Sequence, residues 1–417
     1  MIIQSVRDRN LHQPLISTPP LKQCEVSVIV PVKDEAQTLA ATLAALAHQT
    51  CLNGQPLSPL RYEIIILANN CTDESAQIAR QFARVHPLLA IHVAEITLPT
   101  DRAYIGYVRK LLMDEAYSRL MSLGRSRGII ASTDGDTQVS ATWIAATIAE
   151  IASGIDAVGG RILTDRQSRH ALSPQARTFF LQEVGYLFLV AEMEYYIDPD
   201  PYDPFPRHYQ HYGASLAVTA EMYAKAGGIP PVRTPEDEAF YQSLLRVNAR
   251  FRHSLRVQVT TSARASGRSP VGLANQLTKW TEMSADSALK VEPANVVISR
   301  FRSRRKLRSL WQRALHGHQL SFQEIEPLAN KLGVGDDWLL KELFRPQTFG
   351  GLFEQVTRHQ QQNYPSRWPL IDIKTAIMEL RQSRALRIEQ GIVAFARVGV
   401  ACRRHSVSSA ESIEIPI

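Results

Sequence analysis

Length, composition and charge limit the classes to which this chain can belong. Its 417 residues, 45% hydrophobic and 21% charged, suffice for a large globular domain plus a smaller one and are atypical of a disordered or fibrous protein. The net charge of +7 is a small excess of 47 basic over 40 acidic residues, and the four cysteines form no metal-binding or disulfide pattern. No apolar run has the length of a transmembrane helix and the start lacks a secretory signal, so we expect a cytoplasmic protein.

The first 160 residues alternate apolar, β-rich runs with helical periodicity, which is typical of βαβ units and a largely parallel sheet. Five runs are predicted strands: 26–30, 62–68, 90–96, 128–133 and 157–163. The segments between them are predicted helices: 34–46, a helix from 72, 106–121 and 143–152. Asp34 is the expected N-cap of the first helix, because Gln37 follows at the capping-box spacing.

The alternation weakens after residue 163. Ser173 and Pro174 predict the start of a long helix that reaches Tyr195. The segment DPDPYDPFP, 198–206, contains four prolines and is predicted to be a loop. Helical patterns dominate beyond 272, so the expected organisation is a tail at 1–24, an α/β domain at 25–272, a helical region at 273–405 and a tail at 406–417. The apolar content of the helical region predicts that it packs onto the α/β domain.

Two carboxylates follow the predicted strand 128–133. In STDGDT, Asp134 and Asp136 are spaced i and i+2, which points both side chains toward one face at the carboxyl edge of the sheet. Carboxylate oxygens suit Mg²⁺ or Mn²⁺, which often share their other positions with substrate phosphates. An Asp-Gly turn that ends the strand is the alternative interpretation.

An ordered set of segments carries a family resemblance. VSVIVPVKDE, EIIILANNCTDES, ASTDGDT, HYGASLAV and RTPEDEAF, between about residues 25 and 265, together resemble glycosyltransferase family 2 enzymes of the GT-A fold. The resemblance implies a Rossmann-like, mostly parallel mixed α/β sheet. It also implies metal-dependent transfer of a sugar from a nucleotide-sugar donor to a hydroxyl of an unidentified acceptor.

The resemblance also implies the residues of the donor site. Pro31, Val32 and Glu35 match the segment that lines the nucleotide base and ribose. Asn69 stands where the family usually has an aspartate on the uracil ring, a departure that leaves the base of the donor open. Arg109 falls where such enzymes often place a cation near the donor, although a solvated helix face is the alternative.

The two aspartates match the DxD motif of the family. Asp136 corresponds to its metal ligand and Asp134 to a ribose or metal contact. His253 is a candidate third metal ligand and Arg264 a candidate phosphate contact, with a structural or solvated role as the alternative for each.

The resemblance assigns the acceptor chemistry to Glu236-Asp237, which matches the ED pair of inverting enzymes. Asp237 corresponds to the general base that removes the proton of the attacking hydroxyl. Helix capping is the alternative, because the pair lies in a predicted first turn. The loop 195–212 is the expected acceptor site, and its polar aromatic side chains are the candidate contacts: Tyr202, His208 and His211. A proline-stiffened surface loop is the alternative.

Two further functions stay open. A GT-A-like nucleotidyltransferase would usually show a glycine-rich basic segment after the first strand, and 31–35 contains no glycine. A binder of anionic polymers would use the basic run 300–308, for which a solvated, partly salt-bridged helix face is the other interpretation. We expect no nucleic acid as a partner, while peripheral contact with a membrane and a homodimer are left open.

Overall fold

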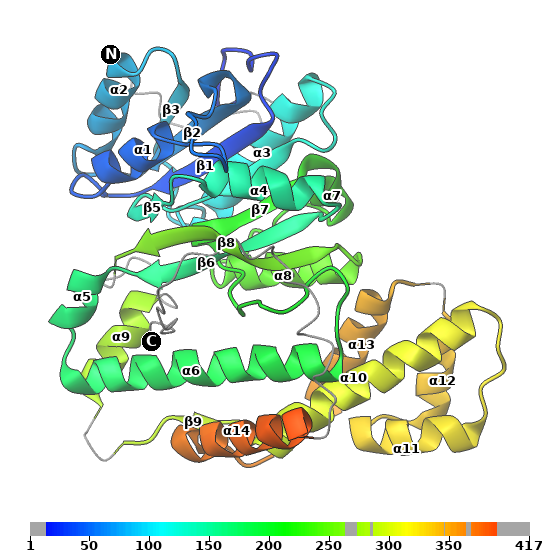
Figure 1. The fold of residues 1–417 in the computed structure, drawn as a ribbon. Helices are drawn as coiled ribbons and strands as arrows, with labels where there is room; N and C mark the ends of the chain where they lie inside the picture. The colour runs from blue at the N-terminus through cyan, green and yellow to red at the C-terminus, as the bar shows by residue number, and fades with distance from the viewer. Residues whose placement is uncertain (1–13, 263–272, 284–286, 346, 364–367, 390–417) are drawn as a thin grey trace, which may run out of the picture.

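The computed structural model describes residues 14–262, 273–283, 287–345, 347–363 and 368–389. An eight-stranded mixed sheet has the order β3-β2-β1-β4-β7-β6-β8-β5 (Figure 1). One half of it is parallel: β3 Ala90–Ile96, β2 Tyr62–Asn69, β1 Val26–Val32 and β4 Ile129–Ser132. The other half is mixed: β7 Leu216–Thr219, β6 Ala157–Thr164, β8 Phe251–Thr261 and β5 Thr137–Val139. All five predicted strands are confirmed.

Helices cover both faces of the sheet. On one face lie α1 Leu39–Ala47, α2 Ser75–Val85 and α4 Trp143–Ala152. On the other lie α3 Ile105–Ser122, α7 Ala220–Lys225 and α8 Glu236–Arg246. Strand β1 is fully buried, with Val28 in the first core and Ile29 in the second, which is why its sequence is a continuous apolar run.

The predicted cap of the first helix is wrong. Asp34 has a left-handed backbone, with φ of 53°, and helix α1 begins only at Leu39. The carboxylate of Asp34 instead accepts hydrogen bonds from the backbone N–H, at 2.6 Å, and the hydroxyl, at 3.1 Å, of Thr72. A partner 38 residues away thus replaces the local capping interaction.

The rest of the described chain is mostly helical. The short α5, Arg166–Ala171, is followed by α6, Pro174–Ile197, where the hydroxyl of Ser173 accepts from the backbone of Ala176 as an N-cap. The later elements are α9 Leu273–Glu282, β9 Lys290–Val291, α10 Ala294–Leu315, α11 Phe322–Leu332, α12 Asp336–Phe344, α13 Phe349–Asn363, β10 Ile371–Asp372 and α14 Ile373–Glu389. Within the ranges given above, no helix combines the length and the apolar composition that a membrane span requires.

The helical region contacts the α/β part in two places. Helix α6 runs below the sheet and shares apolar cores with α9, α10 and α14 (Figure 1). Helix α13 packs on α8, where a Cβ on Gly350 would lie 1.7 Å from the carbonyl oxygen of Leu245, so glycine is required for this approach. Arg246 and Glu354 form an ion pair beside it. The expected packing is observed, while the boundary at 272 falls outside the described residues.

The basic run 300–308 lies on α10, where Arg304 and Arg308 are half-buried and the other four cations are exposed. Arg304 pairs with Glu194, at 2.7 Å, and with Asp198, and Arg308 pairs with Asp198 at 3.0 Å. These ion pairs tie α10 to the end of α6. The expected partly salt-bridged face is therefore observed, and the two arginines are not available to an anionic polymer.

Candidate active site

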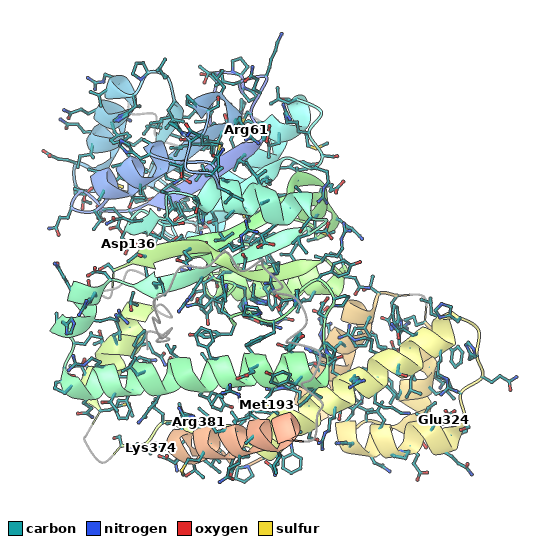
Figure 2. The ribbon with its side chains drawn as sticks, in the orientation of Figure 1. Arg61, Asp136, Met193, Glu324, Lys374 and Arg381 are labelled. Atoms are coloured by element: carbon teal, nitrogen blue, oxygen red, sulfur yellow. The ribbon has the colours of Figure 1, made fainter. Side chains whose placement is uncertain are left out.

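The DxD segment forms a short loop at the carboxyl end of β4. Asp134 and Asp136 are both half-buried there, and the carbonyl of Gly135 between them accepts hydrogen bonds from the hydroxyls of Thr38 and Thr42, at 3.3 and 3.0 Å. Strand β5 begins directly after the loop. Figure 2 shows Asp136 at one end of the sheet. The loop is therefore held against the start of α1 with its carboxylates at the edge where α/β sheets bind ligands.

Arg109 joins this loop to the other acidic motif. Its side chain is buried and its Nη2 donates to Asp134 Oδ1 at 3.1 Å, while its Nε donates to Glu236 Oε1 at 3.1 Å. Its Nη1 donates to the hydroxyl of Ser132 and, at 3.1 Å, to the carbonyl of Gly213. Four of the five guanidinium N–H groups are thus used inside the protein. Arg109 was predicted to contact the donor, and the structure makes it the link between the two motifs instead.

The Gly213 position is needed for this arrangement. A Cβ added to Gly213 would lie 2.5 Å from the guanidinium carbon of Arg109, so any larger residue would displace the arginine. The sequence analysis quoted the segment HYGAS without giving Gly213 or Ser132 a role. Gly213 lies just before strand β7, and a glycine at such a position indicates that another part of the chain packs closely against it. The sequence pattern does not indicate that this neighbour is Arg109.

Asp237 is hydrogen-bonded to the same turn, Gly213–Ser215. Its Oδ2 accepts a hydrogen bond from the backbone N–H of Gly213 at 3.0 Å. It lies in the first turn of α8, next to Glu236, which is 4% exposed. Burial raises the pKa of Glu236, and the neighbouring Asp237 adds to this while Arg109 opposes it. The positive charge of Arg109 therefore does not offset the effect of burial and of Asp237 on Glu236.

The predicted nucleotide-binding residues share the edge with the DxD loop. Pro31 and Val32 end the buried strand β1, and Asn69 ends β2, which pairs with it in parallel. Glu35 follows β1 and is buried, and its Oε2 accepts from Thr38 at 3.0 Å. Parallel strands end at one edge, so these side chains lie on the β1–β2 side of the DxD loop. Their contacts with a nucleotide stay predictions.

One group of three potential metal ligands occurs in the described part of the chain: Asp34, Cys71 and Asp73. Asp73 accepts from the backbone N–H groups of Ala36, at 2.9 Å, and Ser75, at 3.0 Å, and Asp34 from Thr72. These oxygens thus connect the loops after β1 and β2.

His253 lies away from the DxD loop. It pairs with Gly159 of β6. The DxD loop lies next to Thr261 of β8, because Thr261 pairs with Thr137 at the start of β5. Thr261 also pairs with Thr164 of β6, which is five residues beyond Gly159, so roughly 16 Å of strand separates His253 from the loop. The Nδ1 of His253 is 2.7 Å from Asp203 Oδ2, and burial lowers its pKa to about 4. The predicted metal contact of His253 is therefore not formed. Arg264, the predicted phosphate contact, lies outside the described residues.

Two of the three predicted acceptor contacts are misplaced. His208 is 0% exposed, because its Nε2 lies 3.2 Å from the carbonyl of Ser254 and its Nδ1 accepts from the backbone of Gln210 at 3.0 Å. Tyr202 is exposed but lies by Arg250, 5.6 Å from its ring centroid, at the amino end of β6 and so at the opposite edge from the DxD loop. The loop 198–206 does lack regular structure, as predicted.

His211 does lie beside the acidic motif. Its Nε2 is 2.6 Å from Glu238 Oε2, one residue after Asp237, and its ring stacks on Tyr241 with centroids 3.9 Å apart. Of the three predicted acceptor residues it alone is close to the proposed base. The pairing with Glu238 was not predicted, because the two residues are 27 positions apart in sequence.

Comparison with known proteins agrees with this arrangement. Residues 27–206 match the sequence profile described as Glycosyl transferase family 2. Glycosyltransferase AglE from Haloferax volcanii is 31% identical over 139 residues, which span 33% of this chain and 39% of that relative.

Two solved structures are also similar. A complex of S. aureus TarS 1-349 with UDP-GlcNAc has a TM-score of 0.42 at 15% identity, covering 82% of this chain and 93% of that one. A complex of the mannosyltransferase PcManGT from Pyrobaculum calidifontis with GDP-Man and Mn²⁺ has a TM-score of 0.41 at 14% identity, covering 92% and 90%.

The described sheet, with two acidic motifs at its carboxyl edge, defines an α/β transferase fold of the GT-A type. Residues 27–206, less than half of the chain, match glycosyltransferase family 2. The resemblance inferred from the sequence motifs is thereby confirmed.

Proposed function

We propose that this chain transfers a sugar from a nucleotide-sugar donor to an acceptor hydroxyl, with inversion at the anomeric carbon. The observation that supports this most directly is the position of Arg109 between Asp134 and Glu236. That contact places a DxD carboxylate and the acidic pair of α8 in one hydrogen-bonded cluster. A donor held at the first motif and an acceptor at the second would then meet within the same site.

The carboxylates fit a hard divalent cation. Arg109 pairs with Asp134 and with Glu236, Asp134 and Asp136 are half-buried, and carboxylate oxygens are the ligands that Mg²⁺ and Mn²⁺ prefer. Asp136 would hold the ion, with Asp134 as a second contact. The ion would supply a Lewis acid for the charge that develops on the leaving diphosphate. Pro31, Val32, Glu35 and Asn69 would line the nucleotide.

Asp237 would act as the general base. As the acceptor oxygen forms its bond to the anomeric carbon, the hydroxyl proton passes to the carboxylate and the bond to the nucleoside diphosphate breaks. The backbone N–H groups of Gly213 and Glu238 donate to Oδ2 and Oδ1 of Asp237, at 3.0 and 2.9 Å, and so hold its orientation. A single displacement of this kind inverts the anomeric configuration.

A donor screen tests the proposal. Purified protein with Mn²⁺ is combined with UDP- and GDP-linked sugars, since Asn69 leaves the base open, and the thermal shift and the slow hydrolysis of each donor are measured. A stabilising donor that is hydrolysed is the expected result. NMR of the first-formed sugar product then gives the configuration. If no nucleotide sugar binds with or without a divalent ion, the proposal is wrong.

A further inference from the structure

A cluster of arginines lies beside the candidate site on the segment that connects β6 to α6. The segment 161–177 contains four arginines against one aspartate, together with a histidine: Arg161, Arg166, Arg169, Arg177, Asp165 and His170. Arg166 and His170 are exposed, and the other three arginines are half-buried. Like charges at this density repel one another unless an anion or a carboxylate lies close by.

None of these four arginines forms an ion pair with a carboxylate of the described residues. Asp165, which could balance them, is used as the N-cap of α5: its Oδ2 accepts from the backbone and hydroxyl of Ser168, at 2.7 and 2.9 Å. These hydrogen bonds lower the pKa of Asp165. The half-buried Arg304 and Arg308 of α10, by contrast, pair with carboxylates. Within the described residues, the α5 arginines are therefore cations without a carboxylate partner.

The strand order places this cluster at the edge that carries the DxD loop. Thr164, the last residue of β6, pairs with Thr261 of β8, and Thr261 pairs with Thr137 of β5, one residue after Asp136. Two strand spacings, about 10 Å, thus separate the start of α5 from the DxD loop. Figure 1 shows α5 at the same end of the sheet as β5, and Figure 2 places Asp136 there as well.

The cluster also follows the strand that borders the turn holding the proposed base. Strand β6 packs against the turn Gly213–Ser215, where a Cβ on Gly160 would lie 2.1 Å from the hydroxyl of Ser215. That turn holds Asp237. The residues matched to the nucleotide lie on β1 and β2, on the other side of β4. From Gly160 to Thr164 the strand spans about 13 Å, so a group bound at α5 is distant from the attacking hydroxyl.

We propose that Arg166 and Arg169 bind a phosphate group of the acceptor, at a position remote from its reacting hydroxyl. This inference rests on the proposed function, because only a transferase has an acceptor substrate. Guanidinium groups suit phosphate because their N–H groups form paired, charge-assisted hydrogen bonds to its oxygens. A soluble phosphorylated glycan and the headgroup of a membrane lipid both offer this group.

The test uses the full chain and a charge-matched control. The variant is R166Q/R169Q, with R166Q alone as a milder form on an exposed residue. The control is R302Q/K306Q, two exposed cations of α10 with the same loss of charge. Binding of glucose 6-phosphate, of glucose, and of phosphatidylcholine vesicles with and without phosphatidic acid is measured by calorimetry. Binding of UDP and of GDP with Mn²⁺ is measured on the same samples.

We expect a phosphorylated probe to bind the wild type in preference to its neutral counterpart, with the sugar phosphate or the vesicle indicating the source. R166Q/R169Q should weaken that binding about tenfold or more and R166Q by less, while R302Q/K306Q leaves it unchanged. Nucleotide binding should be unchanged in all variants.

The inference is wrong if no phosphorylated probe binds, if the control loses as much affinity as the variant, or if R166Q/R169Q lowers nucleotide affinity, which would assign the arginines to the donor. A wild type that binds phosphate but no nucleotide would instead overturn the proposed function, and with it the acceptor role.

Discussion

Two arginines, the buried Arg109 and the half-buried Arg304, each lie between two carboxylates, yet their surroundings differ. Arg109 contacts Asp134 and Glu236, and Arg304 contacts Glu194 and Asp198. Burial acts to lower the pKa of both guanidinium groups, but the adjacent carboxylates outweigh it and raise both pKa values above the usual range. Judged by the arginine alone, the two clusters are alike.

The carboxylates separate the two clusters. Around Arg304, the further cations Arg207 and Arg308 balance the acids, and the pKa of Glu194 falls to about 2 because Arg304 and Arg207 outweigh its burial. Around Arg109, burial and Asp237 outweigh the arginine and raise the pKa of Glu236. A balanced cluster is a structural tie, whereas an excess of carboxylates at a sheet edge is a place for a cation or a proton transfer.

The largest expected effect removes the proposed metal ligand. Asp136→Ala should abolish the enhancement of nucleotide binding by Mn²⁺ and lower transfer by about a thousandfold, since a Lewis acid at the leaving group contributes several kcal/mol. Calorimetry with and without Mn²⁺ measures the first quantity. Asp101→Ala, at a surface carboxylate that is 74% exposed, is the control. Unchanged metal dependence in Asp136→Ala would show that the ion, if any, binds elsewhere.

The next effect concerns the proposed base. Asp237→Asn keeps the size of the side chain and its ability to accept from Gly213, but it removes the basic oxygen. Turnover should fall by about a hundredfold or more, with nucleotide affinity nearly unchanged. Glu221→Gln, at an exposed carboxylate of α7, is the control and should retain most of the turnover. Near-normal turnover in Asp237→Asn, or a product with retained configuration, would remove Asp237 from this role.

Arg109 and Arg304 give a matched pair of substitutions. Arg109→Met should lower turnover by about tenfold to a hundredfold, because Asp134 and Glu236 lose the group that holds them together, and it should cost about 3–5 kcal/mol of stability. Arg304→Met should cost a similar amount of stability with little change in turnover per folded molecule. Denaturant unfolding and kinetics on each variant measure both quantities.

Arg109→Lys sharpens the comparison, because lysine keeps the charge but cannot reach Asp134 and Glu236 together. Relative to Arg109→Met, Arg109→Lys should restore more of the lost stability than of the lost turnover. Equal turnover in Arg109→Met and the wild type would show that Arg109 is a structural tie like Arg304.

The elements were predictable where local pattern decides them. Helix α4 was predicted with its observed bounds, Trp143–Ala152, because its apolar periodicity and its ends agree with its packing. Asp134 and Asp136 were predicted from a short motif at a strand end and Glu236 and Asp237 from one in a helix's first turn, and each lies in the predicted element position.

The misplaced residues depend on contacts that no local pattern contains. His253 was a candidate metal ligand and His208 a candidate acceptor contact, but both are buried, with Asp203 as the partner of His253. The burial of Arg109 likewise requires Gly213, which is 104 residues away. Sequence spacing predicts which residues share an edge, while tertiary packing decides which of them stay accessible there.

The smallest effect is a dependence of stability on pH that belongs to the Arg304 cluster. The pKa of Glu194 is lowered from 4.5 to about 2 in the folded protein, so the carboxylate contributes stability above its unfolded pKa. That contribution should be lost as the pH falls from about 4.5 toward 2, by up to about 3 kcal/mol in the free energy of unfolding. Denaturant unfolding across this range measures it, with Glu194→Gln as the reference.

The wild type should lose more stability than Glu194→Gln over this interval, and the two stabilities should converge at its acid end. Parallel curves for the two proteins would show that Glu194 is not held ionised by Arg304 and Arg207, and the contrast with Glu236 would then fail. Glu236 has a raised pKa, so it should contribute in the opposite sense, with protonation on acidification favouring the folded state.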